Sequence, residues 1–200
     1  MPSVLFIGDR ATPAMDAAGY PFLVSALMTS SYYDRGLQFS VVSEKGLRIA
    51  DVLARFDELI LPANPDIISI CIGMEDILPS DGSYPTPLVK YSDGYLALLE
   101  RLKEAFPNIK PIMIEPFLLP GCATEENFNA IFTAATNYQQ AVRTLSRDCG
   151  TTFIPAQSAL ARASKLRAPE YWLSDGLLPT DAGHGLLAGE WINAAKELIL

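Results

Sequence analysis

Short apolar runs alternate with segments of helical periodicity along the chain, and this alternation constrains the fold more than any other feature of the sequence. Strands that alternate with helices build a parallel sheet covered by helices on both faces. We therefore predict a three-layer α/β/α sandwich, flavodoxin-like in outline, with a central parallel sheet of about five strands. The 200 residues show no linker or repeat, which predicts a single domain over residues 1–200. The predicted strands are residues 4–7, 37–42, 66–72, 112–114 and 151–154.

The spacing of apolar side chains also predicts where helices lie. Ile49, Val52 and Phe56 stand on one face of a helix that follows the second strand. A longer helix is expected to begin with Thr124 as its N-cap and to end at Gly150, the residue type that favours a left-handed C-cap.

Composition and charge exclude several classes of function. Half of the residues (50%) are hydrophobic and 19% are charged, which is enough apolar material for a sizeable core. The net charge of -8 leaves no basic stripe to neutralise phosphates, so we expect no nucleic-acid partner. No apolar run approaches the roughly 20 residues that span a bilayer, so no membrane span is predicted.

Cysteine and histidine are scarce. Three cysteines without close spacing make a poor disulfide framework, and the single histidine, His184, argues against multi-histidine zinc catalysis. We therefore expect no metal and no cofactor. The N-terminus has no basic signal region and enters an apolar strand at once, so the predicted location is the reducing cytoplasm.

The working site of such a fold is expected at one edge of the sheet. Ligands bind beyond the carboxyl ends of parallel strands, where the strand order reverses. The segments that reach this edge are residues 8–12, 43–46, 73–76, 115–121 and 174–184.

Four of these segments resemble the sequence blocks of the SGNH/GDSL hydrolases, in that family's order and spacing. Residues 8–12 (Gly-Asp-Arg-Ala-Thr) resemble the nucleophile block Gly-Asp-Ser-x-Thr, and Gly46 resembles the second-block glycine. Residues 65–76 end in Gly-Met-Glu-Asp where the third block has Gly-x-Asn-Asp, and residues 175–184 resemble the last block, Asp-Gly-x-His-Pro followed by Gly-His. The resemblance covers nearly the whole chain and implies the SGNH-hydrolase fold and a lipase or esterase ancestry.

Three catalytic positions of that family hold other residues here. Arg10 stands at the position of the nucleophilic serine, Glu75 at that of the oxyanion-hole asparagine, and Leu178 at that of the histidine, whereas Gly46 and Asp175 match the pattern. A guanidinium is not a nucleophile, leucine accepts no proton, and carboxylate oxygens oppose a developing oxyanion. The resemblance therefore implies an inactive member that keeps a cleft for a small ligand, an acyl ester or a sugar, or for a partner.

Two other classes of function stay open, so the sequence leaves undecided whether the chain is an enzyme. One is a hydrolase of ester or acetyl groups, similar to a carbohydrate esterase, that uses a non-standard set of residues. The other is an interaction or scaffold protein without a ligand. His184 is a candidate base and Thr12 a candidate nucleophile, but we expect His184 to be structural and Thr12 to bond to its turn.

The acidic residues of this edge also allow two interpretations. One is a carboxylate cluster for acid–base chemistry or magnesium binding. The other, which we favour, is that Asp9 and Asp76 brace loops while Arg10 forms an ion pair with Glu75, with Asp175 as the next candidate partner. A planar guanidinium can engage a carboxylate with two parallel hydrogen bonds. The four carboxylates are Asp9, Glu75, Asp76 and Asp175.

Aromatic side chains are expected beside the cleft. Tyr84 and Tyr91 lie in a predicted loop over residues 78–91, and the sequence leaves open whether they stack on a ligand or pack locally. Trp172 is expected to pack at the cleft's side. Cys71, on the predicted central strand, is expected to be a core residue rather than a thiol nucleophile.

Overall fold

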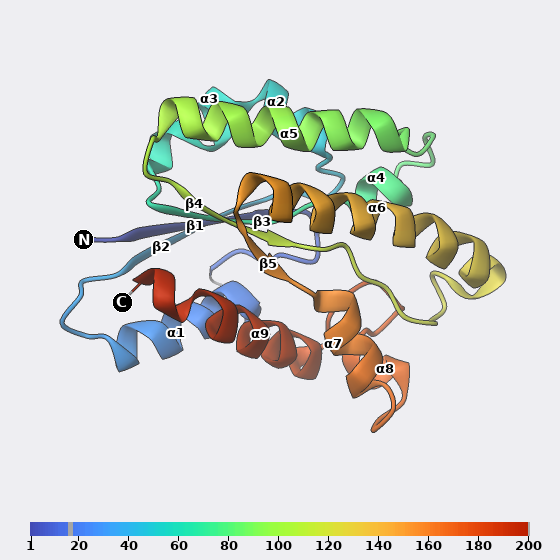
Figure 1. Cartoon of the computed structure of the whole chain (residues 1–200). Coiled ribbons are helices and arrows are strands. Elements are labelled where there is room, and N and C mark those ends of the chain that lie inside the picture. The colour runs from blue at the N-terminus through green and yellow to red at the C-terminus, as the bar shows by residue number, and fades with distance from the viewer. Residues whose placement is uncertain (16–17, 200) are drawn as a thin grey trace.

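The computed structural model describes residues 1–15 and 18–199, and it confirms the predicted three-layer α/β/α sandwich (Figure 1). One parallel sheet runs through the molecule in the order β2-β1-β3-β4-β5. Every predicted strand is present, with ends that differ by one or two residues. The strands are β1 (Ser3–Gly8), β2 (Gln38–Ser43), β3 (Ile67–Cys71), β4 (Lys110–Ile114) and β5 (Thr152–Ile154).

Helices cover both faces of the sheet. In Figure 1, α1 and α9 lie on one side of it, and α2, α3, α5 and α6 lie on the other. None of the helices in the described part of the chain is long and apolar enough to cross a membrane. The helices are α1 (Tyr20–Ser31), α2 (Ile49–Ala54), α3 (Phe56–Leu59), the 3-10 helix η1 (Leu61–Ala63), α4 (Met74–Ile77), α5 (Leu88–Ala105), the 3-10 helix η2 (Glu125–Asn127), α6 (Phe128–Cys149), α7 (Ala156–Ala163), α8 (Pro169–Trp172) and α9 (Asp181–Ile199).

The strand β1 shows why the sheet needs cover on both faces. Val4 and Phe6 pack into the core on the side of α1 and α9, and Leu5 and Ile7 pack into the core on the side of α2 and α5. All four side chains are buried. An uninterrupted apolar run of this kind is typical of a central parallel strand, because successive side chains point to opposite faces.

Two helix predictions were wrong in detail. The helix expected from Ile49 through Phe56 is divided into α2 and α3, because the backbone at Arg55 leaves the helical range between them. Thr124 does not cap the long helix. Its hydroxyl donates to the Leu119 carbonyl oxygen at 3.0 Å, and α6 begins four residues later. Gly150 ends α6 in the left-handed conformation, as predicted.

The loop predicted over residues 78–91 is shorter than expected, because α5 already begins at Leu88. Tyr91 therefore lies in the core rather than over a cleft, and its hydroxyl donates to the Ile72 carbonyl oxygen at 3.0 Å. Three short helices, α4, α7 and α8, were not predicted.

Candidate functional site

The topology brings the segments after β1 and β3 together. The chain goes from β1 to its neighbour β2 and then crosses to β3, on the other side of β1. The strand order therefore reverses between β1 and β3. In doubly wound folds this switch point is where ligands bind. Arg10 follows β1 and Glu75 follows β3, so both stand at the switch point.

The turn after β1 is held by its own backbone and by one buried carboxylate. The Thr12 amide donates to the Asp9 carbonyl oxygen at 2.9 Å, and the Ala11 amide donates to Asp9 Oδ1 at 2.9 Å. A Cβ at Gly8 would collide with Thr12 Oγ1, so the turn requires glycine there. Because the neighbouring side chains point inward, Arg10 is the part of the turn that reaches the surface.

Glu75 lies on α4 and is the partner of Arg10. Arg10 Nε is 3.3 Å from Glu75 Oε1, with the two side chains 24% and 1% exposed, so the predicted ion pair is confirmed. The two parallel hydrogen bonds that a guanidinium can make to a carboxylate are not formed. Oε2 accepts a hydrogen bond from the Ser80 amide at 2.8 Å, and Oε1 accepts none from the described residues.

Asp9 and Asp76 are fully buried carboxyls that hold backbone in place. Asp76 Oδ2 accepts from the Ile49 amide at 3.2 Å, and Asp9 accepts from Ala11 as described above. Burial raises the pKa of Asp9 to about 7 and the pKa of Asp76 to about 6. Among residues 1–15 and 18–199, no three His, Cys, Asp or Glu side chains are grouped so as to hold a metal ion.

Asp175 forms a turn. Its Oδ1 accepts from the amides of Leu177 and Leu178 at 2.8 and 2.7 Å, and the Leu178 carbonyl oxygen accepts from the Ser174 amide at 2.8 Å. The ion pairs of the described residues place no cation beside Asp175, so it is not the partner of Arg10. The aspartate therefore orients backbone, and the partly buried leucine supplies no base.

His184 and Thr12 are both buried. The His184 ring stacks on Tyr20 with the centroids 6.4 Å apart, and burial lowers the pKa of the imidazole. Thr12 Oγ1 shares a hydrogen bond of 3.1 Å with the Tyr20 hydroxyl. Neither side chain is placed to meet a substrate from solvent.

The remaining predicted cleft residues are spread out. Gly46 has φ +85°, a conformation that favours glycine, although an added Cβ would meet no atom within 4 Å. Tyr84 is 92% exposed, and Trp172 is half-buried against the Tyr171 ring at 5.0 Å. Cys71 is buried, and burial raises the pKa of its thiol, as befits a core residue.

Sequence reasoning missed Arg48. This residue begins α2, two positions after Gly46, and its guanidinium reaches the segment that follows α4. Nη1 donates to the Tyr84 carbonyl oxygen at 3.3 Å, and Nη2 is 3.3 Å from Asp81 Oδ1 and also donates to Ser83 Oγ. The sequence signal that could have identified Arg48 is its position two residues after Gly46, the second-block glycine.

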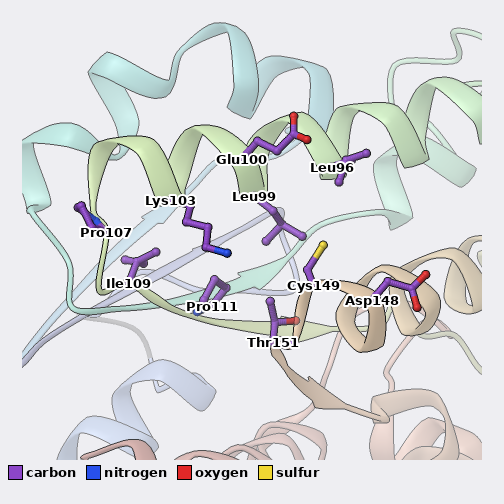
Figure 2. Close-up of a pocket in the computed structure, with 11 residues that line it drawn as sticks. Leu96, Leu99, Glu100, Lys103, Pro107, Ile109, Pro111, Asp148, Cys149 and Thr151 are labelled. Atoms are coloured by element: carbon purple, nitrogen blue, oxygen red, sulfur yellow. The ribbon is translucent and has the colours of Figure 1, made fainter.

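A cavity of about 480 Å³ lies at the opposite, amino edge of the sheet, between the ends of α5 and α6 (Figure 2). Figure 2 shows the Cys149 thiol and the Lys103 ammonium among the apolar side chains that line it. No sequence pattern predicted this cavity. Its lining residues are Leu96, Leu99, Glu100, Lys103, Pro107, Ile109, Pro111, Asp148, Cys149, Gly150 and Thr151.

Comparisons with known proteins agree with this geometry. A model of the GDSL-like lipase/acylhydrolase family matches residues 6–186. An acetylxylan esterase from Geobacillus stearothermophilus is 28% identical over 203 residues, which cover 92% of this chain and 90% of that protein. A solved structure described as a GDSL-like lipase from Parabacteroides merdae superposes with a TM-score of 0.91 at 26% identity, over 98% of this chain and 95% of that one. The crystal structure of the acetylxylan esterase Axe2 shares the fold, with a TM-score of 0.83 at 24% identity over 96% and 93% of the two chains.

Proposed function

The chain belongs to the GDSL-like lipase/acylhydrolase family, and from this we propose that it is a member without serine-esterase chemistry that binds a ligand at the former active site. We also propose that residues 1–200 form a single domain. The observation that carries it is the ion pair between Arg10 and Glu75, at 3.3 Å, on the turns that follow the two switch-point strands. The pair places a cation and an anion where the family pattern has a hydroxyl and an amide.

The chemistry of a serine hydrolase fails at each of these positions. Such an enzyme needs a hydroxyl nucleophile, an adjacent base, and N–H donors where the oxyanion forms. Arg10 stays protonated at any ordinary pH and Leu178 accepts no proton. Oε2 of Glu75 accepts from the Ser80 amide and Oε1 faces the guanidinium of Arg10 as an ion-pair partner, so the carboxylate supplies no donor.

The ligand class rests on the likeness to a relative. The protein from Geobacillus stearothermophilus that is 28% identical is named as an acetylxylan esterase. We therefore propose an acetylated sugar, or a short acyl ester of similar size, as the ligand. A reducing compartment such as the cytoplasm suits the three free cysteines, Cys71, Cys122 and Cys149.

The first experiment measures hydrolysis of p-nitrophenyl acetate and of acetylated xylo-oligosaccharides. We expect a rate equal to that of a heat-denatured control. Turnover above this background that disappears in Asp175→Ala or His184→Ala would replace the proposal with a hydrolase that uses a non-standard set of residues.

Variants that restore the family's catalytic residues also test this proposal. Triad members act as a unit, so Arg10→Ser and Leu178→His should each be inactive alone. The triple variant Arg10→Ser, Glu75→Asn, Leu178→His is the one expected to show esterase activity. Activity of Arg10→Ser by itself would mean that a base is already in place.

Ligand binding separates the proposal from a scaffold protein. A ligand that binds only the folded state at 100 times its Kd adds about 2.7 kcal/mol of stability. We expect acetylated xylo-oligosaccharides to raise the Tm and their deacetylated forms to raise it less. Identical melting curves with and without these sugars would favour the scaffold.

A further inference from the structure

Residues 79–86, called the strap below, connect α4 to α5 and are tied to the former active site at both ends. The Ser80 amide donates to Glu75 Oε2 at 2.8 Å. The Thr86 amide donates to the Asp76 carbonyl oxygen at 2.8 Å, and the Tyr138 hydroxyl donates to the Thr86 carbonyl oxygen. The two attachment points on α4 are consecutive residues at the switch point.

Arg48 holds the middle of the strap. Its guanidinium contacts the strap at Asp81, Ser83 and Tyr84, as described above. The backbone of Arg48 is fixed in the first turn of α2, where its amide donates to Asp51 Oδ2 at 3.0 Å. One side chain therefore bridges the segment after β2, which carries Gly46, and the segment after β3, which carries Glu75.

The strap has little packing of its own. Residues 80–85 are exposed apart from these polar contacts. Gly82 adopts a φ of +74°, a conformation that favours glycine, and its amide donates to the Pro79 carbonyl oxygen at 3.3 Å to close a turn. Segments that bury few apolar groups open at a lower free energy than the core, so the polar contacts set the stability of the closed strap.

We propose that the strap is a movable cover of the former active site and that Arg48 is its latch. Closed, the strap occupies Glu75 Oε2 through Ser80 and keeps the carboxylate against Arg10. Opening frees that oxygen and exposes the ion pair to an incoming ligand. This inference rests on the proposed function, because the cover regulates entry to the same site.

The latch is sensitive to salt. The Asp81 side chain is 67% exposed, and exposed charges are screened beyond about 8 Å at physiological ionic strength and closer in at higher salt. Added salt therefore shifts the strap toward the open state.

Hydrogen exchange measured by mass spectrometry tests the latch. In Arg48→Gln, peptides that contain the amides of Ser80, Ser83 and Thr86 should exchange about tenfold faster than in the parent protein. The matched control is Arg162→Gln, which removes an ion pair to Glu190 at 3.2 Å between α7 and α9. Equal strap exchange in the parent and in Arg48→Gln would overturn the role of Arg48.

A second variant removes the same contacts by changing the strap residues instead of Arg48. Asp81→Ala with Ser83→Ala removes the side-chain partners of Arg48 at exposed positions, so global folding is not at risk. The same acceleration is expected at Ser80 and Thr86, which are read here because Asp81 Oδ1 also accepts from the Ser83 amide at 2.9 Å. Loss of protection in Arg48→Gln alone would assign the effect to α2 and overturn the latch.

The cover is tested by chemical modification of Arg10 with phenylglyoxal, read at that site by mass spectrometry. Both latch variants should raise the modification rate of Arg10 several-fold, and high salt should do so in the parent. Faster hydrogen exchange in the strap together with an unchanged modification rate of Arg10 would show that the strap does not cover the site. Esterase activity would refute the proposed function without changing any of these rates, so the two failures are distinguishable.

Discussion

Two buried glutamates stand after neighbouring strands of the sheet, and each has an arginine partner. Glu75 follows β3 and lies 3.3 Å from Arg10, whereas Glu115 follows β4 and lies 3.5 Å from Arg143. The glutamates are equally buried, at 1% and 2% exposed, but Arg143 is 50% exposed and Arg10 is 24% exposed. By residue type the two pairs are interchangeable.

The backbone donors of the two glutamates are alike, whereas the surroundings of the two cations differ. One oxygen of each glutamate accepts from a backbone amide, Glu115 Oε1 from Gln157 at 3.1 Å and Glu75 Oε2 from Ser80 at 2.8 Å. The other oxygen of Glu75 is buried and accepts no hydrogen bond from the described residues, so the guanidinium of Arg10 offsets the charge there. Because water screens the more exposed Arg143, the comparison teaches that the dependence of a buried anion on its cation is set by the exposure of that cation.

The largest expected effect comes from removing the arginine at the switch point. Arg10→Met leaves Glu75 Oε1 without a counter-charge, and stranding a buried charge costs about 3 kcal/mol. Urea unfolding at pH 7 should show this loss in the free energy of unfolding, and Glu75→Gln in the same chain should recover part of it. If Arg10→Met and Arg143→Met cost the same, the comparison fails.

A smaller effect is expected on the pH dependence of stability, from Asp9 in the turn that carries Arg10. Burial raises the pKa of Asp9 in the folded protein to about 7, against 3.8 for an aspartate in water, so the folded state binds the proton more tightly than the unfolded state. Stability should therefore fall as pH rises from about 4 to 7, by about 2 kcal/mol between pH 5 and pH 7 for this group.

The measurement is the difference between the parent and Asp9→Asn across that range, since the difference isolates Asp9 from other titrating groups. Asp57→Asn, at an exposed position of α3, is the control. A pH profile that is parallel in the parent and in Asp9→Asn would contradict the raised pKa.

The smallest effect is expected at the second pair. Arg143→Met removes a half-exposed cation from a carboxyl that keeps its backbone donor, so the loss should not exceed about 1 kcal/mol. The Arg143 guanidinium also lies 5.0 Å from the centroid of the Phe153 ring, and methionine retains part of that packing. A loss near that of Arg10→Met would show that burial of the glutamate decides the cost, whatever the exposure of its arginine.

The fold was predictable because its central strands, β1 and β3, are buried on both faces, which leaves apolar runs in the sequence. The breaks between elements were less visible. The division at Arg55 is marked by no proline or glycine, and α5 begins at Leu88 directly after Pro87. The cavity at the amino edge was not predictable, because its lining comes from three separate stretches of the chain, residues 96–103, 107–111 and 148–151.

At the site, the ion pair between Arg10 and Glu75 was predictable because parallel strands place their following segments side by side. Its single-oxygen geometry was not predictable. It depends on the amide of Ser80, and a backbone donor has no signature in the residue type. The strap contacts of Arg48 were missed for a related reason, since two of its three partners are a serine and a backbone carbonyl.

Asp175 has a structural role that does not depend on catalysis. Its side chain holds two amides of a turn, so replacing it would cost stability whether or not the chain uses the family's triad. Selection for folding alone is then enough to keep the aspartate in place. A count of surviving motif residues in a family tree therefore mixes two histories, and an intact aspartate is no sign that the ancestral reaction persists.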